Sequence, residues 1–222
     1  MDPIDLAELK AQKPTLRGYS HAGAFFVAVG AGSVLVAAAP TPLSTLASTI
    51  YVATLCLLFG VSASYHLVWW GPRMREFFAR LDHAMIFLFI AGSNTPFSLL
   101  ALSTSTAKKV LIPLWTAAIV CALLRMSGKQ LPRFFQSLSY VALGWFAAWS
   151  MPEAFKVIGV TGVALLAFGG VAYTVGAIIF WKKAPNPIPR VFGYHEVFHV
   201  LTIVAGAAHF VAVARLVLSV QP

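Results

Sequence analysis

The run VIGVTGVALLAFGGVAYTVGAIIFW occupies residues 157–181 and contains no Asp, Glu, Lys or Arg. A helix of this length is long enough to cross the hydrocarbon core of a bilayer. Its five glycines indicate close approach by neighbouring helices. Similar apolar runs occur along the chain, and together they predict seven membrane spans, near residues 20–39, 44–68, 82–102, 109–126, 134–151, 157–181 and 195–219. The sequence therefore predicts an all-α membrane protein folded as a seven-transmembrane helix bundle.

The composition agrees with this fold class. Only 10% of the 222 residues are charged, whereas about 25% is usual for a soluble domain. The connections between runs are short, which predicts a single transmembrane domain over residues 20–222 after a cytoplasmic segment, residues 1–19. That segment is polar and lacks the early apolar core of a cleavable signal peptide, so we expect the first span to be an uncleaved anchor. Both cysteines, Cys56 and Cys121, fall inside spans, and no disulfide framework is expected.

The distribution of basic residues predicts the orientation. Of the sixteen Lys and Arg residues, twelve fall on the side of the N-terminus and four on the other side: Lys108, Lys109, Lys156 and Arg215. The positive-inside rule then places the N-terminus in the cytoplasm and the C-terminus outside. Because loop residues account for the net charge of +9, we expect membrane lipids, and no nucleic acid, as partners. The compact loops are typical of a bacterial multi-pass protein of the plasma (inner) membrane. No oligomeric state is predicted.

Four ionisable residues fall at one predicted depth in three different spans. His66 ends the second span, Asp82 begins the third, and His195 and His199 begin the seventh. All three span ends lie on the predicted cytoplasmic side. Ionisable groups inside apolar spans are costly and usually mark function. Their shared depth predicts a buried site.

The residue types predict that this site binds zinc. His195 and His199 are four residues apart, a spacing at which two imidazoles on one helix face can bind one Zn²⁺. His66 would be the third ligand, which leaves a position open for water. Asp82 could hold or deprotonate that water, or be a ligand itself. Ser62 lies four residues before His66 and shares its helix face.

Simpler roles are open for several of these side chains. A salt bridge to a loop arginine such as Arg80 would explain Asp82, and a bond to its own helix would explain the Ser62 hydroxyl. Interfacial or hydrogen-bonded positions are expected for the remaining histidines, namely His21, His83 and His209.

One pattern indicates a different chemistry. His195-Glu196-x-x-His199 matches H-E-x-x-H, the zinc metalloprotease signature, in which Glu196 would be the general base. The pattern is short, no acidic ligand motif follows it, and His66 lies far upstream in another span.

The ordered set of motifs resembles the bacterial hemolysin III proteins and their relatives, the progestin and adipoQ receptors. The matching segments are LRGYSH at residues 16–21, Ser62-x-x-x-His66, LDHAMIF at 81–87 with IAGSNTP at 90–96, and His195-x-x-x-His199 running on to His209-Phe210. They follow the order of the spans along the whole chain.

The resemblance implies a seven-helix bundle with the N-terminus inside and a zinc site near the cytoplasmic leaflet. It implies His66, His195 and His199 as ligands, Ser62 beside them, and Asp82 holding the zinc-bound water. In relatives the position of Glu196 need not be glutamate, which argues against a catalytic base there. The wider superfamily includes alkaline ceramidases, and hydrolysis of lipid amides has been proposed for the receptor branch.

The leading hypothesis is a zinc-dependent hydrolase of a lipid amide, with Asp82 and Ser62 as catalytic residues and His66, His195 and His199 as metal ligands. The alternative is a non-enzymatic sensor or regulator of membrane state, with a structural zinc and a lipid inside the bundle. A pore-forming cytolysin fits less well because a secreted toxin should be soluble before it inserts. The intramembrane protease based on Glu196 is the fourth hypothesis.

Overall fold

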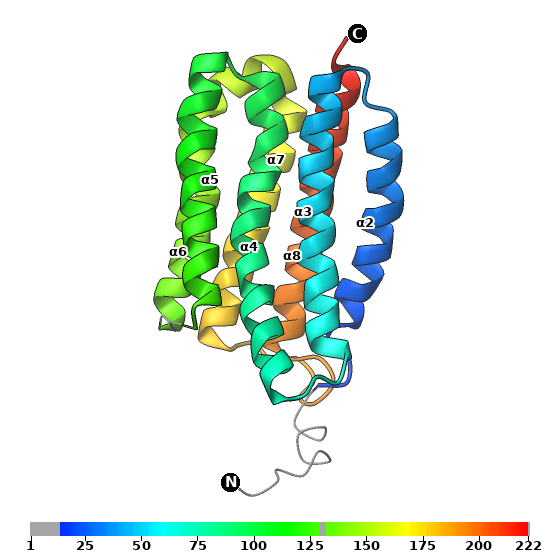
Figure 1. Ribbon diagram of the computed structural model, residues 1–222, viewed down its shortest axis with the longest axis vertical. Coiled ribbons are helices and arrows are strands. Elements are labelled where there is room, and N and C mark those ends of the chain that lie inside the picture. Colours follow the sequence, from blue (N-terminus) through cyan, green and yellow to red (C-terminus); the bar gives the residue numbers. More distant parts are fainter. Residues whose placement is uncertain (1–13, 129–131, 222) are drawn as a thin grey trace, which may run out of the picture.

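The computed structural model describes residues 14–128 and 132–221. These residues form an all-helical bundle in which successive helices run antiparallel along the long axis (Figure 1). The helices are α2 (Tyr19–Ala37), α3 (Pro42–Leu67), α4 (Pro72–Ala101), α5 (Thr104–Met126), α6 (Arg133–Trp145), the 3-10 helix η1 (Phe146–Ser150), α7 (Met151–Lys182) and α8 (Tyr194–Ser219). The predicted all-α architecture is confirmed.

The count of membrane spans differs from the prediction. Within the described residues, six segments are long and apolar enough to cross a membrane, against seven predicted. The predicted fifth and sixth spans fall in one continuous segment, Phe134–Lys182. The physical reason is that η1 leads directly from α6 into α7, so the polar residues between the two predicted spans, Glu153 and Lys156, lie in the first turns of α7 and not in a loop.

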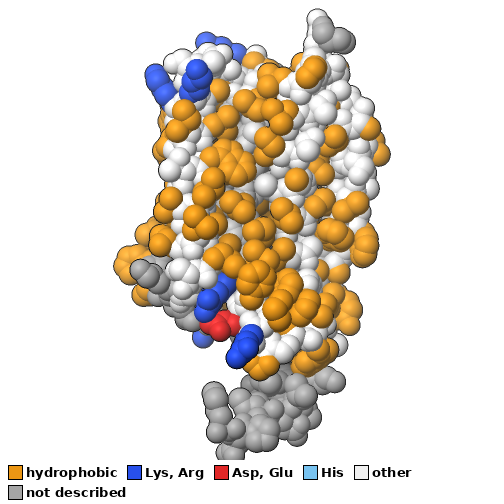
Figure 2. Space-filling view, viewed as in Figure 1, with side chains coloured by type: hydrophobic (Ala, Val, Ile, Leu, Met, Phe, Trp, Pro, Cys, Tyr) orange, Lys and Arg blue, Asp and Glu red, His pale blue; other side chains and the backbone are white. Residues whose placement is uncertain are grey.

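The polarity of the bundle is that of a protein surrounded by lipid. Large apolar side chains cover the visible face, and the coloured charged groups gather toward the two ends (Figure 2). The interior carries buried polar residues, among them Ser44, Ser48 and Thr202. This distribution agrees with the cost of leaving polar groups against lipid.

Three helix ends meet at one end of the bundle. The C-terminal end of α3 and the N-terminal ends of α4 and α8 lie together there (Figure 1). α4 begins at Pro72, ten residues before the predicted start of the third span, because residues 73–80, four of which are charged, continue the helix beyond its apolar part. Asp82 therefore lies inside α4, while His66 and His195 lie close to the ends of their helices.

Candidate metal centre

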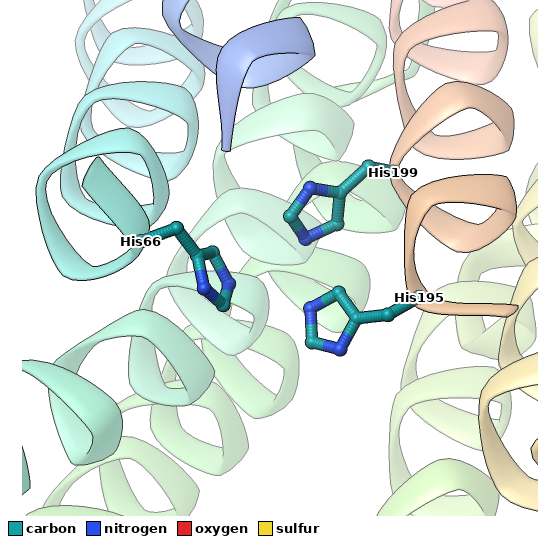
Figure 3. Close-up of side chains that lie close together, drawn as sticks. All are labelled: His66, His195 and His199. Atoms are coloured by element: carbon teal, nitrogen blue, oxygen red, sulfur yellow. The ribbon is translucent and has the colours of Figure 1, made fainter. Parts of the chain in front are cut away.

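Three histidines from two helices converge at this end of the bundle. His66 is in the last turn of α3, and His195 and His199 are in the first two turns of α8. One ring nitrogen from each residue lies within 4.8 Å of the others. Figure 3 shows the His66 ring facing the other two rings across the space between the helices. The predicted convergence is therefore present, and the three side chains can hold a metal ion.

The donor set suits zinc. Nitrogen atoms bound to one tetrahedral Zn²⁺ are roughly 3.4 Å apart, and the three ring nitrogens, all within 4.8 Å of one another, lie near that separation. The cluster is shielded, since His66 is 5% exposed and His199 is 1% exposed. The buried Nδ1 atom of His199 has no hydrogen-bond partner among the described residues.

Asp82 and Ser62 lie beside the cluster. The Oδ2 atom of Asp82 is 4.0 Å from Nε2 of His66. The Ser62 side chain is buried and interacts with the Asp82 carboxylate. Arg80, the partner considered for Asp82, pairs with Glu76 and donates to the Met126 carbonyl oxygen at 3.3 Å. The structure thus keeps the carboxylate next to the histidines.

His21 is the residue whose position differs most from its expected interfacial role. It is 3% exposed, and its ring stacks on that of His199 with 3.8 Å between ring centroids and 9° between planes. This contact with a candidate metal ligand was not predicted from the sequence. The LRGYSH segment at residues 16–21 was the available signal, because its match to the family pattern includes this histidine.

Glu196 is buried but is occupied by other contacts. Its carboxylate pairs with Arg17 and accepts a hydrogen bond of 2.8 Å from the Gly193 N–H, which caps α8. The pairing of Glu196 with Arg17 was not predicted from the sequence. These contacts agree with a structural role for Glu196 and not with a free general base.

The two remaining histidines, His83 and His209, lie within hydrogen-bonding distance of backbone oxygens, which agrees with the hydrogen-bonded positions predicted for them. His83 Nδ1 lies 2.7 Å from the Ala79 oxygen, and His209 Nε2 lies 3.3 Å from the Leu166 oxygen. Both side chains also line a cavity of about 340 Å³.

This cavity connects the histidines with the opposite part of the bundle. His195, His199 and Asp82 line it, and so do Leu102 and Met151, which lie at the far ends of α4 and α7. Its walls are mostly apolar. Ligand cavities typically measure about 300–1,000 Å³, so this one has the size and lining expected for an apolar ligand.

The family model described as "Haemolysin-III related" matches residues 9–210, a range that contains the whole histidine cluster. The chain belongs to the haemolysin III family. It is similar to the Bacillus cereus protein named Hemolysin-3, with 31% identity over 181 residues, which is 80% of this chain and 78% of that protein. The Hemolysin-3 homolog of Bacillus subtilis (strain 168) is 25% identical over 166 residues, 74% of each chain.

This haemolysin III protein also has animal relatives. Human monocyte to macrophage differentiation factor is 26% identical over 203 residues, 88% of this chain and 80% of the human protein. That similarity agrees with the predicted relation to the progestin and adipoQ receptors. The family match and the six apolar helical segments together make the haemolysin III chain a multi-pass membrane protein.

Proposed function

We propose that this haemolysin III protein is a zinc-dependent hydrolase of a lipid amide. The observation that carries the proposal is the apolar cavity that reaches the histidine cluster, with Asp82 and Ser62 in its wall. A hydrolase of a lipid needs these elements in one place: room for an acyl chain, a metal site and a group that accepts a proton.

His66, His195 and His199 would hold the zinc ion. Three protein ligands are typical of catalytic zinc, and imidazole is one of the ligand types that zinc prefers. When bound, zinc supplies a Lewis acid that polarises a carbonyl group and makes water more acidic.

The protein residues would carry out the proton transfers. Asp82 accepts a proton as the oxygen of water bonds to the amide carbonyl carbon. It returns the proton to nitrogen as the C–N bond breaks, and the products are a fatty acid and an amine. The buried Ser62 hydroxyl orients the Asp82 carboxylate, and the apolar cavity holds the acyl chain away from bulk water.

The variant Asp82→Asn tests this role. It removes the proton acceptor and keeps the shape of the side chain, so zinc content should stay at the wild-type level. The hydrolysis rate should fall by about 10²–10⁴-fold, the usual contribution of a positioned acid or base. The measurements are elemental analysis of the purified protein and release of the fatty acid from a fluorescent ceramide in detergent.

His66→Ala is the control that removes the metal, and it should lose both zinc and hydrolysis. An unchanged rate in Asp82→Asn would overturn the proposed mechanism. A wild-type protein that is well folded, purified without chelator and free of metal would overturn the zinc assignment.

A second candidate function is a sensor of membrane state with a structural zinc. The observation that favours it is that the histidine cluster bridges α3 and α8, so a bound metal would tie two helices together. In that case a ceramide would bind without product, and removal of zinc would lower the unfolding temperature with no turnover to lose.

The protease and cytolysin hypotheses receive less support. Arg17 and the Gly193 N–H occupy the Glu196 carboxylate, which leaves it poorly placed as a base. If the protein cleaves a peptide substrate, loss of that cleavage in Glu196→Gln at saturating zinc, with cleavage by Asp82→Asn unchanged, would favour proteolysis instead. The apolar segments of the bundle suit a resident membrane protein, and permeabilisation of liposomes by low doses of purified protein would favour the cytolysin.

The proposal includes seven passes with the N-terminus in the cytoplasm. The antiparallel course of α6 and α7 supports two crossings within Phe134–Lys182. The twelve-to-four distribution of basic residues supports the orientation.

A further inference from the structure

Residues 14–21, which we call the N-terminal strap, pass across the end of the bundle that holds the histidine cluster. The Thr15 N–H donates to the Arg190 oxygen at 2.9 Å, and the Leu16 N–H donates to the Val191 oxygen at 3.3 Å. These bonds join the strap to the connection that leads into α8. The strap is therefore attached to the segment immediately before His195.

The strap also contacts the first turn of α8 through a buried ion pair. Arg17 pairs with Glu196, and the two side chains are 17% and 3% exposed. Glu196 lies between the two histidines of α8 and also caps that helix at Gly193. A buried pair contributes little net stability because both charges lose water, but it fixes geometry and is costly to break on one side.

The strap touches the histidine of α3 as well. Gly18 has a φ of +90°, and a Cβ atom at this position would lie 2.6 Å from the Cβ atom of His66. Only glycine allows the backbone this conformation and this approach without strain. Three residues later, His21 stacks on His199. One short segment thus contacts ligand residues of both helices.

We propose that the N-terminal strap positions the metal ligands, with Arg17 as the positioning residue that holds the first turn of α8 in register with His66. The inference rests on the proposed metal site. Residues that orient metal ligands from outside typically change metal affinity by 10–100-fold when they are replaced. Arg17 acts through Glu196, the carboxylate with which it pairs.

The test is metal affinity of the full-length protein in detergent, measured by competition with a chelator, together with the visible absorption spectrum of the Co²⁺-loaded protein. Arg17→Gln should weaken Zn²⁺ binding by about 10–100-fold and change the Co²⁺ spectrum. The double variant Arg17→Glu/Glu196→Arg restores an ion pair and should recover part of the affinity. Arg73→Gln removes an exposed arginine at the same end and should bind like wild type.

Gly18→Ala provides an independent test if Arg17→Gln fails to fold. It leaves the ion pair intact, pushes on His66, and should also weaken Zn²⁺ binding. Wild-type affinity and an unchanged Co²⁺ spectrum in Arg17→Gln, or in Gly18→Ala where only that variant folds, would overturn the role of the strap and leave the metal site standing. A wild-type protein that binds no metal would instead overturn the proposed function, and the strap inference with it.

Discussion

At the scale of single residues, the orientation of the ligand rings depends on their neighbours. The stacked contact between the His21 and His199 rings fixes the plane of the His199 ring, because rotation of the His199 ring about its Cβ–Cγ bond would bring it into collision with His21. His21 is outside the group of three whose nitrogens converge. The structure thus gives His21 a supporting position behind a ligand.

Two substitutions of His21 distinguish a residue that supports the His199 ring from one that binds the metal itself. His21→Phe keeps a flat ring against His199 and removes both nitrogens, so Zn²⁺ affinity should stay within a few-fold of wild type. His21→Ala removes the ring and should weaken binding by about 10–100-fold. Chelator competition on both purified variants is the measurement. Complete loss of zinc in His21→Phe, as in His66→Ala, would instead make His21 a ligand.

The sequence allowed the three converging histidines to be predicted because span order and charge fixed their common depth. The position of His21 could not be predicted from spacing in this way, since a single histidine at the start of a span has no second histidine at a diagnostic distance along the chain. Only the family motif at residues 16–21 includes it. The ion-pair partner of Glu196 could not be predicted from the sequence for a similar reason. Arg17 is far from it in the chain, and only the path of the strap brings the two together.

At the scale of elements, glycines set how closely helices approach. In α7, a Cβ atom at Gly169 would lie 2.3 Å from the His209 ring, which confirms the close approach predicted for this run. Gly159 behaves differently: a Cβ atom there would meet nothing within 4 Å, and its φ of +63° interrupts the helix. Composition could predict that glycines matter in this segment, but not which one packs and which one bends the chain.

The tightest of these contacts lies between α3 and α4. A Cβ atom at Gly92 would be 2.1 Å from the Oγ1 atom of Thr54, whose hydroxyl is bonded to its own helix. Gly92→Ala should therefore lower the free energy of unfolding by about 1–3 kcal/mol, as overpacking usually does. Gly30→Ala is the matched control, because a Cβ atom there meets nothing within 4 Å. Equal stability of the two variants in a denaturant titration would contradict the packing argument.

At the scale of the whole molecule, hydropathy predicted the fold class and the end of the bundle where the site lies. It could not predict how the chain passes from α6 to α7, because η1 carries apolar residues through the turn. The number of passes therefore depends on whether Phe134–Lys182 crosses once or twice.

Reporter fusions to the C-terminus distinguish the two arrangements. With seven passes and a cytoplasmic N-terminus, a C-terminal alkaline phosphatase should be active and a C-terminal green fluorescent protein should be dark. Six passes with the same N-terminus would reverse both results. A fusion after Gly128 should report the cytoplasm in either case and serves as the control, because it precedes the segment in question.

The cavity has one consequence for the choice of lipid. His199 and His209 both line it, and their ten-residue separation on α8 corresponds to about 15 Å along the helix axis. A chain whose carbonyl group sits at the histidine cluster must extend along this wall, and a short chain would leave its far part unfilled. The length of the cavity would then select substrates by the length of their acyl chain, while the lipid headgroup would remain outside the cavity and would not affect this selection.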